Sequence, residues 1–306
     1  MRIVFMGSAA LALPSLMQLD QQAEHEVVGV ITQPDRPAGR KRFLTPCPVN
    51  VAASSMNLKV CTPEKISSDE MVEQMQDWKP DLLVVVAYGQ YIPKRLISIA
   101  SYKAINLHPS LLPVYRGAAP IQWALINGDV QTGVSIITVA EKMDAGDILK
   151  QEAMTIYETD TAATLHDRCA ELGARLLLDT IDDIATGSIT SYAQDESKVV
   201  KVRKLNKADG IIDWHQPAVN IYNRIRAFDP WPGSRCKLPS GEVLSIWKAV
   251  CVDGEGIPGE VLDDALTIAT AKGALRLLEV QLAGGKRMQT EVFLHGRSLQ
   301  KGTVFV

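Results

Sequence analysis

The sequence predicts an α/β protein in which a doubly wound, mainly parallel sheet is followed by a small β-barrel. Strand patterns alternate with helical patterns over the first part of the chain, as in sheets that are covered by helices on both faces. Residues 81–87 form an apolar run without polar alternation, which indicates a strand buried on both sides. The last part instead has short strands between frequent turns, a pattern typical of a barrel.

The elements of the first part alternate as a doubly wound sheet requires. Pro14 suits the first turn of a helix, and Gly187 is a typical residue just past a helix end. Strands are predicted over residues 2–6, 27–31, 81–87, 104–107 and 134–139, and helices over about 14–19, 48–56, 67–78 and 161–187.

The character of the chain changes after the long helix. Residues 188–208 are polar and basic, which indicates a linker. A helix is then expected at about 217–228, with strands near 242–250, 259–263, 266–270 and 274–282. We therefore divide the 306 residues into a sheet domain over 1–189, a basic linker over 190–208 and a β-barrel over 209–306.

Bulk composition argues against several classes of protein. The net charge is −3, so any contact with nucleic acid must use a local basic patch. Five cysteines, an odd number without CxxC spacing, argue against a disulfide framework or a zinc site and favour a reducing compartment. No apolar run reaches about 18 residues, the length that indicates a membrane span. We expect a cytoplasmic protein with no metal and no membrane contact.

A polar pair lies at the end of one predicted strand. Asn106 and His108 are two residues apart, and side chains at that spacing share one face of a strand. Pro109 ends the strand and leaves both groups near its carboxyl end, where ligands bind in open parallel sheets. An amide can donate to a developing oxyanion, and an imidazole can exchange protons near neutral pH.

Acidic residues follow the next strand along the chain. Asp144 and Asp147 come after residues 134–139, so we expect one of them to return to the same crevice. A carboxylate beside a histidine raises the pKa of the imidazole and orients its ring. Any one of these residues alone is more often structural, but the long loop 111–120 favours a functional interpretation. Asparagine, histidine and aspartate together suit acyl transfer to an amine.

Two segments of this region resemble a known family. Residues 106–129 (NLHPSLLPVYRGAAPIQWALINGD), followed by residues 143–149 (MDAGDIL), are similar to the signature of the 10-formyltetrahydrofolate-dependent formyltransferases. The resemblance implies a Rossmann-like catalytic domain, 10-formyltetrahydrofolate as formyl donor, and a catalytic trio of Asn106, His108 and Asp144. The folate-binding residues that it implies are Ser110, Leu111, Leu112, Pro113, Tyr88, Gly89 and Ile92.

A basic loop indicates the acceptor of the formyl group. Residues 29–50 (GVITQPDRPAGRKRFLTPCPVN) resemble the loop with which the methionyl-tRNA formyltransferase family contacts the acceptor stem of initiator tRNA. Residues 211–214 and 225–232 also match that family, whose OB-like carboxyl-terminal barrel helps to hold tRNA. The resemblance implies initiator methionyl-tRNA as partner, and we expect a monomer. The implied tRNA contacts are Arg36, Arg40, Lys41, Arg42, Lys204 and Lys207.

Departures from the family pattern leave alternatives open. Residues 8–11 read Ser-Ala-Ala-Leu where the family usually has Thr-Pro-Asp-Phe, which puts the border of the substrate site in question. One alternative is a formyltransferase for a small or nucleotide-sugar amine, and another is a hydrolase that releases formate from the same folate; neither needs the basic loop. The third is a non-catalytic RNA-binding protein, which would not need the Asn106, His108 and Asp144 set.

Overall fold

The computed structural model describes residues 1–39, 42–297 and 299–306. The chain forms two compact units, and it passes between them more than once. The first unit contains Met1–Gly117, Thr132–Met154 and His166–Lys201, and the second contains Ala118–Gln131, Thr155–Leu165 and Val202–Val306. These units describe how the chain packs, and the predicted domain boundaries at 189 and 209 stay a prediction.

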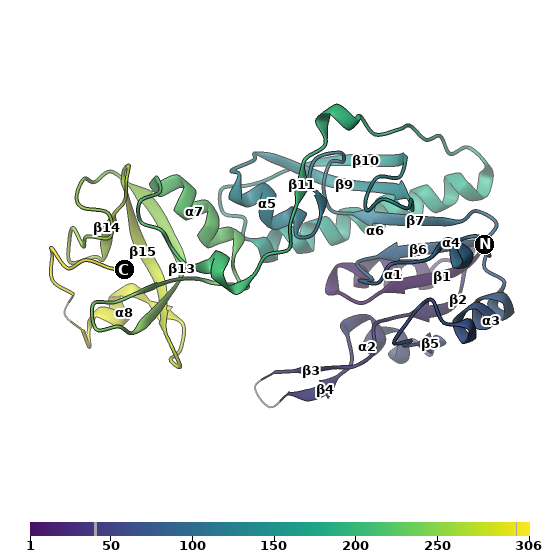
Figure 1. The fold of residues 1–306 in the computed structure, drawn as a ribbon, viewed down its shortest axis with the longest axis horizontal. Helices are drawn as coiled ribbons and strands as arrows, with labels where there is room; N and C mark the ends of the chain where they lie inside the picture. The colour runs from purple at the N-terminus through teal and green to yellow at the C-terminus, as the bar shows by residue number, and fades with distance from the viewer. Residues whose placement is uncertain (40–41, 298) are drawn as a thin grey trace. The chain divides into compact units, whose positions relative to one another are not determined.

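A seven-stranded sheet forms the centre of the first unit (Figure 1). Its strand order is β10-β9-β7-β6-β1-β2-β5. The neighbouring pairs β5–β2, β2–β1, β1–β6 and β6–β7 are parallel, and β9 runs antiparallel to β7. The predicted doubly wound, mainly parallel sheet is thus confirmed. The strands are β1 (Arg2–Gly7), β2 (Glu26–Ile31), β5 (Val60–Cys61), β6 (Leu82–Val86), β7 (Ala104–His108), β9 (Gln131–Thr138) and β10 (Ile148–Thr155).

Helices pack against this sheet where glycines permit close approach. A methyl group at Gly29 of β2 would lie 2.6 Å from the Trp78 ring at the end of α3, and one at Gly173 of α6 would lie 2.6 Å from Leu107 of β7. Both glycines therefore allow a helix and a strand to approach more closely than a side chain would permit. The helices of the first unit are α1 (Leu13–Asp20), α2 (Pro48–Ser55), α3 (Asp69–Trp78), α4 (Lys94–Ile97) and most of α6 (Ala162–Thr186), whereas α5 (Pro120–Ile126) belongs to the second unit.

The strand order places a switch point between β1 and β6. From β1 the chain moves to β2 and β5 on one side, and it then continues with β6 and β7 on the other. Parallel strands with this order open a crevice at their carboxyl ends, where the connections diverge. In this sheet that edge carries Ser8 after β1, Ala87 after β6, and His108 at the end of β7.

Short strands occur where the sequence predicted loop or linker. β3 (Arg36–Ala38) and β4 (Phe43–Thr45) form an antiparallel hairpin within the segment expected to be a basic loop. β8 (Arg116–Gly117) pairs with β11 (Lys201–Val202). The 3₁₀ turns are η1 (Ala10–Ala12), η2 (Glu196–Lys198) and η3 (Lys207–Gly210). Part of the predicted linker is therefore ordered by backbone pairing.

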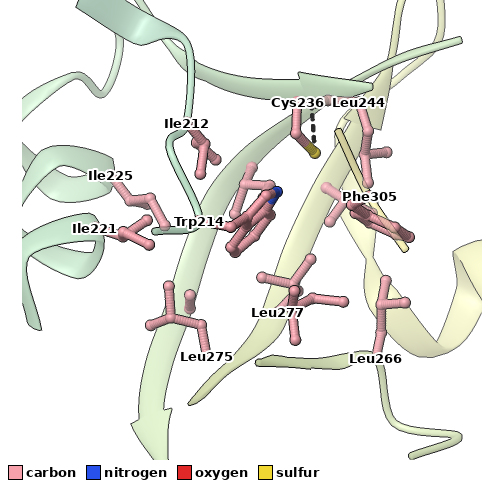
Figure 2. Packing of buried hydrophobic residues seen from close by; sticks show 14 of the residues in the cluster. Ile212, Trp214, Ile221, Ile225, Cys236, Leu244, Leu266, Leu275, Leu277 and Phe305 are labelled. Carbon is pink, nitrogen blue, oxygen red and sulfur yellow. Dashed lines mark hydrogen bonds between the residues drawn. The ribbon is translucent and has the colours of Figure 1, made fainter. Parts of the chain in front are cut away.

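The second unit has its own antiparallel sheet and core. The strand order is β12-β13-β15-β14, and β16 pairs with β15. Trp214, Leu275, Leu277 and Phe305 meet in the core that this sheet surrounds (Figure 2). The predicted small carboxyl-terminal barrel is confirmed. Its elements are α7 (Ala218–Ala227), β12 (Ser234–Lys237), β13 (Val243–Val252), β14 (Thr267–Ala269), β15 (Ala274–Leu282), β16 (Met288–Gln289) and α8 (Thr290–Leu294).

One barrel strand predicted from sequence is not continuous. Residues 259–263 make only two isolated bridges, Glu260 to Val304 and Val261 to Ile268. Gly259 has a φ of +91°, which extended strand residues do not adopt, so the ladder is interrupted there. Within the described residues the five cysteines are unpaired. No described helix is both long and apolar enough to cross a membrane.

Candidate active site

β7 brings the predicted polar pair to the carboxyl edge of the sheet. The strand lies between β6 and β9, and its register opposes His108 to Ser135 of β9. His108 is buried, with 5% of its surface exposed, whereas Asn106 is half-buried. The two side chains share one face of the strand because they are two residues apart. The imidazole is therefore enclosed by protein, while the amide remains open to a ligand.

The hydrogen bond of His108 defines its tautomer. Its Nε2 lies 3.0 Å from the carbonyl oxygen of Tyr115. A carbonyl can only accept, so Nε2 must carry the proton and donate it. Nδ1 is then the ring nitrogen that remains outside this bond, and it lies 3.7 Å from Asp144 Oδ1. This distance is too long for a hydrogen bond, so the contact is electrostatic.

A closed loop carries Asp144 to the histidine. The Thr138 amide donates to the Asp147 carbonyl at 2.9 Å, and the Asp147 amide donates to Thr138 Oγ1 at 2.9 Å. A methyl group at Gly146 would lie 1.7 Å from the Thr138 carbonyl oxygen. The base of the loop therefore closes only with glycine at position 146.

Asp144 reaches the site by a different route from the one expected. Because β9 is antiparallel to β7, its carboxyl end lies beside the amino-terminal half of β7, away from His108. The loop after β9 therefore has to fold back toward the crevice. Asp144 has a φ of +53°, a left-handed conformation that costs energy and occurs often at functional sites. Its Oδ2 accepts a hydrogen bond of 2.9 Å from the Gly117 amide.

The segment from Ser110 to Pro113 is a compact loop with internal support. Ser110 is fully buried, and its hydroxyl donates to the Val114 carbonyl at 2.6 Å. The Ser135 hydroxyl accepts from the Leu112 amide at 3.1 Å and donates to the Ser110 carbonyl at 2.6 Å. Gln151 Nε2 donates to the Leu112 carbonyl at 2.8 Å. The Ser110 hydroxyl thus shapes the loop, while Leu111 and Pro113 remain half-buried.

The residues after β6 divide between the core and the crevice. The side chains of Tyr88 and Ile92 are buried in a hydrophobic cluster of the first unit, and burial raises the pKa of the Tyr88 phenol. Gly89 is exposed. The Tyr88 carbonyl accepts hydrogen bonds of 3.2 Å from the Ser8 hydroxyl and from Gln33 Nε2. At this edge Tyr88 therefore presents its backbone to the crevice.

Arg36 and Arg42, the described basic residues of the hairpin segment, are exposed. Arg36 lies on β3 and its Nη2 is 3.3 Å from Glu64 Oε2. Arg42 precedes β4 with a φ of +52°. Phe43 and Leu44 beside it are 68% and 70% exposed, so the hairpin carries apolar as well as basic side chains. The predicted tRNA contacts Arg40 and Lys41 lie outside the described residues.

The basic segment near residue 204 is only partly neutralised. Arg203 forms an ion pair with Asp209, and Nη1 to Oδ2 measures 2.8 Å. That bond holds the pKa of Asp209 down at about 2. Lys204 and Lys207 are exposed. Each of these lysines is available to an anionic partner.

Three residues of the site were missed by the sequence reasoning. Ser135 and Gln151 support the loop that contains Leu112, and Gln194 contacts the loop that carries Asp144. Ser135 gave no signal, since it lies inside an apolar strand. Gln151 and Gln194 lie in segments without a motif. Among the described residues, no group of three or more His, Cys, Asp or Glu side chains is placed to hold a metal ion.

Two family models match this chain. Residues 1–181 match a model described as formyl transferase, and residues 204–298 match its carboxyl-terminal domain. The chain belongs to the formyl transferase family. The family assignment made from residues 106–129 and 143–149 is therefore confirmed, and a non-catalytic RNA-binding role has no support.

Curated relatives in the formyl transferase family match over nearly the whole chain. A methionyl-tRNA formyltransferase of Pelotomaculum thermopropionicum is 42% identical and covers 99% of this chain and 98% of its own length. A methionyl-tRNA formyltransferase of Bacillus velezensis is 40% identical, with 99% and 97% covered. Both domains of this formyl transferase are included in these matches.

Solved structures of lower sequence identity share the fold. HypX from Aquifex aeolicus in complex with tetrahydrofolic acid has a TM-score of 0.65 at 21% identity and covers 96% of this chain. The chain spans 47% of that protein. The sugar 3N-formyltransferase WlaRD has a TM-score of 0.63 at 17% identity, with 92% of this chain and 97% of WlaRD covered. At these identities the likeness establishes the fold alone.

Proposed function

We propose that this formyl transferase moves the formyl group of 10-formyltetrahydrofolate to the α-amine of methionyl initiator tRNA. The observation that carries the proposal is the match to methionyl-tRNA formyltransferases at 40–42% identity over both domains. It confirms the activity predicted from the basic loop and the signature. A formyl-folate donor agrees with the family and with the tetrahydrofolate bound by the HypX neighbour.

The proposed reaction is direct transfer. The methionyl nitrogen attacks the formyl carbon, the bond from that carbon to N10 of folate breaks, and the amine loses a proton while N10 gains one. The formyl oxygen carries negative charge in the tetrahedral intermediate. Asn106 and protonated His108 are proposed to donate to this oxygen, as preorganised donors do in acyl transfer.

The geometry of His108 supports separate roles for its two ring nitrogens and for Asp144. With Nε2 bonded to Tyr115, Nδ1 is the only ring atom that can donate to the oxyanion. Asp144 Oδ1, 3.7 Å from Nδ1, is proposed to orient the ring by its charge, and at this distance it does not hold the Nδ1 proton in a hydrogen bond. Asp144 is also proposed to help remove the proton of the amine, directly or through water.

The folate and tRNA contacts are also proposals. We assign the folate site to the crevice at the carboxyl ends of β1 and β6, with Ser110–Pro113, Gly89 and the backbone of Tyr88 at its border and Ile92 packed behind it. Exposed cations are suited to bind phosphates of the acceptor stem. The tRNA contacts proposed are Arg36, Arg40, Lys41, Arg42, Lys204 and Lys207.

Three broader expectations belong to the same proposal. The protein acts in the cytoplasm, as a monomer, and its domains are those predicted over 1–189 and 209–306. Sedimentation of the purified protein tests the oligomeric state. Expression of the two segments as separate chains, followed by circular dichroism, tests whether each one folds.

Radiolabelled formyl transfer tests the proposed function. The protein is incubated with 10-[¹⁴C-formyl]tetrahydrofolate and with methionyl initiator tRNA, methionyl elongator tRNA or a nucleotide-linked amino sugar. We expect label on the initiator tRNA at least tenfold faster than on the other acceptors. Equal labelling of the amino sugar would favour the alternative of a small-amine acceptor. Release of free formate with no labelled acceptor would indicate a hydrolase.

A further inference from the structure

Gln194 is buried against the loop that carries Asp144. Only 8% of its surface is exposed. Its Nε2 donates to the Asp144 carbonyl at 2.8 Å and to the Gly146 carbonyl at 2.7 Å. One amide group thus uses both of its hydrogens on two carbonyls of the same loop.

The orientation of this amide follows from its other partner. Arg116 Nε donates to Gln194 Oε1 at 2.9 Å. A guanidinium has no acceptor, so the oxygen of the amide must face Arg116 and the nitrogen must face the loop. Arg116 is itself 5% exposed and pairs with Glu196, with Nη2 to Oε1 at 2.8 Å. Gln194 is therefore held in place before it contacts the loop.

The next residue after Arg116 completes the frame around Asp144. The Gly117 amide donates to Asp144 Oδ2 at 2.9 Å. The carboxylate is thus fixed from the side of Arg116 and Gly117, and the backbone is fixed by Gln194. Asp144 has left-handed backbone geometry, a conformation that persists only where its surroundings hold it.

We propose that Gln194 is a positioning residue for formyl transfer, which holds the Asp144 loop so that the carboxylate faces His108 Nδ1. This inference rests on the proposed function of Asp144. Gln194 does not touch the reacting atoms in this account and acts through the two loop carbonyls. Displacement of a catalytic group by about 1 Å can cost roughly a hundredfold in rate, so the turnover number is the quantity expected to respond.

Two substitutions separate the loop contacts from packing. Gln194→Met keeps a side chain of similar length and removes all three hydrogen bonds. Gln194→Glu keeps an acceptor for Arg116, removes the two donors to the loop, and places a carboxylate oxygen against both loop carbonyls. We expect either variant to lower kcat by roughly 10- to 100-fold, with KM for folate and for tRNA within about threefold of wild type. Thr180→Val, which removes a buried hydroxyl from α6 of the same unit, is the control and should keep kcat.

A double-mutant cycle tests whether Gln194 acts through Asp144. In an Asp144→Ala background, Gln194→Glu is expected to change kcat by less than about twofold, because the group that it positions is absent. If the fall in kcat of the double variant instead equals the product of the two single-variant falls, Gln194 does not act through Asp144 and the inference is overturned.

A measurement without substrate keeps the inference separate from the proposed function. The ¹H shift and hydrogen exchange of the Gly117 amide report on its bond to Asp144. We expect Gln194→Glu to shift this resonance and to speed its exchange at least tenfold, while amides of β1 and β6 stay protected. An unchanged Gly117 amide would overturn the inference. An inactive wild-type enzyme with a shifted Gly117 amide would instead refute the proposed function alone.

Discussion

The loop that carries Asp144 and the basic hairpin are two contrasting ways to build part of a functional surface. The Asp144 loop is closed by hydrogen bonds between Thr138 and Asp147 and is bonded to Gly117. The hairpin presents Phe43 and Leu44 at 68% and 70% exposure, and Arg36, one of its two described arginines, pairs with an exposed glutamate.

The difference agrees with the role proposed for each region. A carboxylate that assists proton transfer must stand at one distance from an imidazole, so its position is fixed before substrate binds. A surface that receives a polyanion gains most of its affinity from charge, which tolerates movement of individual side chains. Changes in the first region should therefore alter turnover, and changes in the second should alter binding.

The largest effect is expected at the oxyanion donors. Asn106→Ala and His108→Ala should each lower kcat by roughly 10²–10³-fold, because each removes a proposed donor to the developing negative charge. Single-turnover formyl transfer at saturating tRNA measures this step. His166→Ala, which removes a part-exposed histidine that also contacts an aspartate, is the control. Near-normal turnover in both site variants would exclude their assigned roles.

Gly146→Ala tests whether the closed geometry of the Asp144 loop is required for turnover. The added methyl group would lie 1.7 Å from the Thr138 carbonyl, so the base of the Asp144 loop must open. We expect kcat to fall by roughly 10- to 100-fold, as assayed by formyl transfer, together with a lower melting temperature. A methyl group at Gly296 meets nothing within 4 Å, so Gly296→Ala should leave both unchanged. Wild-type turnover in Gly146→Ala would show that the loop geometry is not required.

Arg42→Ala tests the other side of the comparison. Loss of one phosphate contact should raise KM for methionyl-tRNA roughly tenfold at physiological salt and leave kcat at saturation within twofold. The slope of log(kcat/KM) against log[salt] should also decrease in magnitude by about one. Arg95→Ala, at an exposed arginine paired with Asp69, is the matched control. A fall in kcat without a change in KM would indicate that Arg42 acts in the chemical step, and the contrast between the Asp144 loop and the hairpin would then not hold.

The smallest effect is expected at the Arg203–Asp209 pair. The hydrogen bond from Arg203 lowers the pKa of Asp209 to about 2, whereas an unfolded chain has about 3.9. A depressed folded-state pKa stabilises the protein above about pH 4, and this stabilisation is lost as the pH falls toward 2. Because Arg203 is partly exposed, solvent screens the pair, and Asp209→Asn should lower the free energy of unfolding by only about 1 kcal/mol at pH 7.

Chemical unfolding followed at pH 7 and at pH 3 measures this effect. The difference between wild type and Asp209→Asn should shrink at the lower pH. Asp69→Asn, at a more exposed ion pair, should change the free energy of unfolding by less than about 0.5 kcal/mol at either pH. A difference that grows toward pH 3 would contradict the sign derived from the pKa of Asp209.

Sequence periodicity predicted most of the regular elements because their signals are local. The apolar run now seen as β6 and the helix α6 both follow from patterns within one segment. The hairpin of β3 and β4 was missed because its strands are three residues each, too short for a hydrophobic alternation to mark them.

The candidate site was predictable in part for the same reason. Asn106 and His108 are two residues apart on one strand, and that spacing alone sets their common face. The approach of Asp144 was expected, but the antiparallel direction of β9 was not, because strand direction depends on pairing between distant segments. Gln194 could not be found at all, since its contacts join residues about 50 positions apart in sequence.

The closed base of the Asp144 loop has a consequence for how this protein can vary in length. Residues 139–146 span a fixed gap between Thr138 and Asp147, so a single inserted or deleted residue would shift Asp144 along the chain relative to His108. Length variation among related chains should therefore be absent between residues 138 and 147.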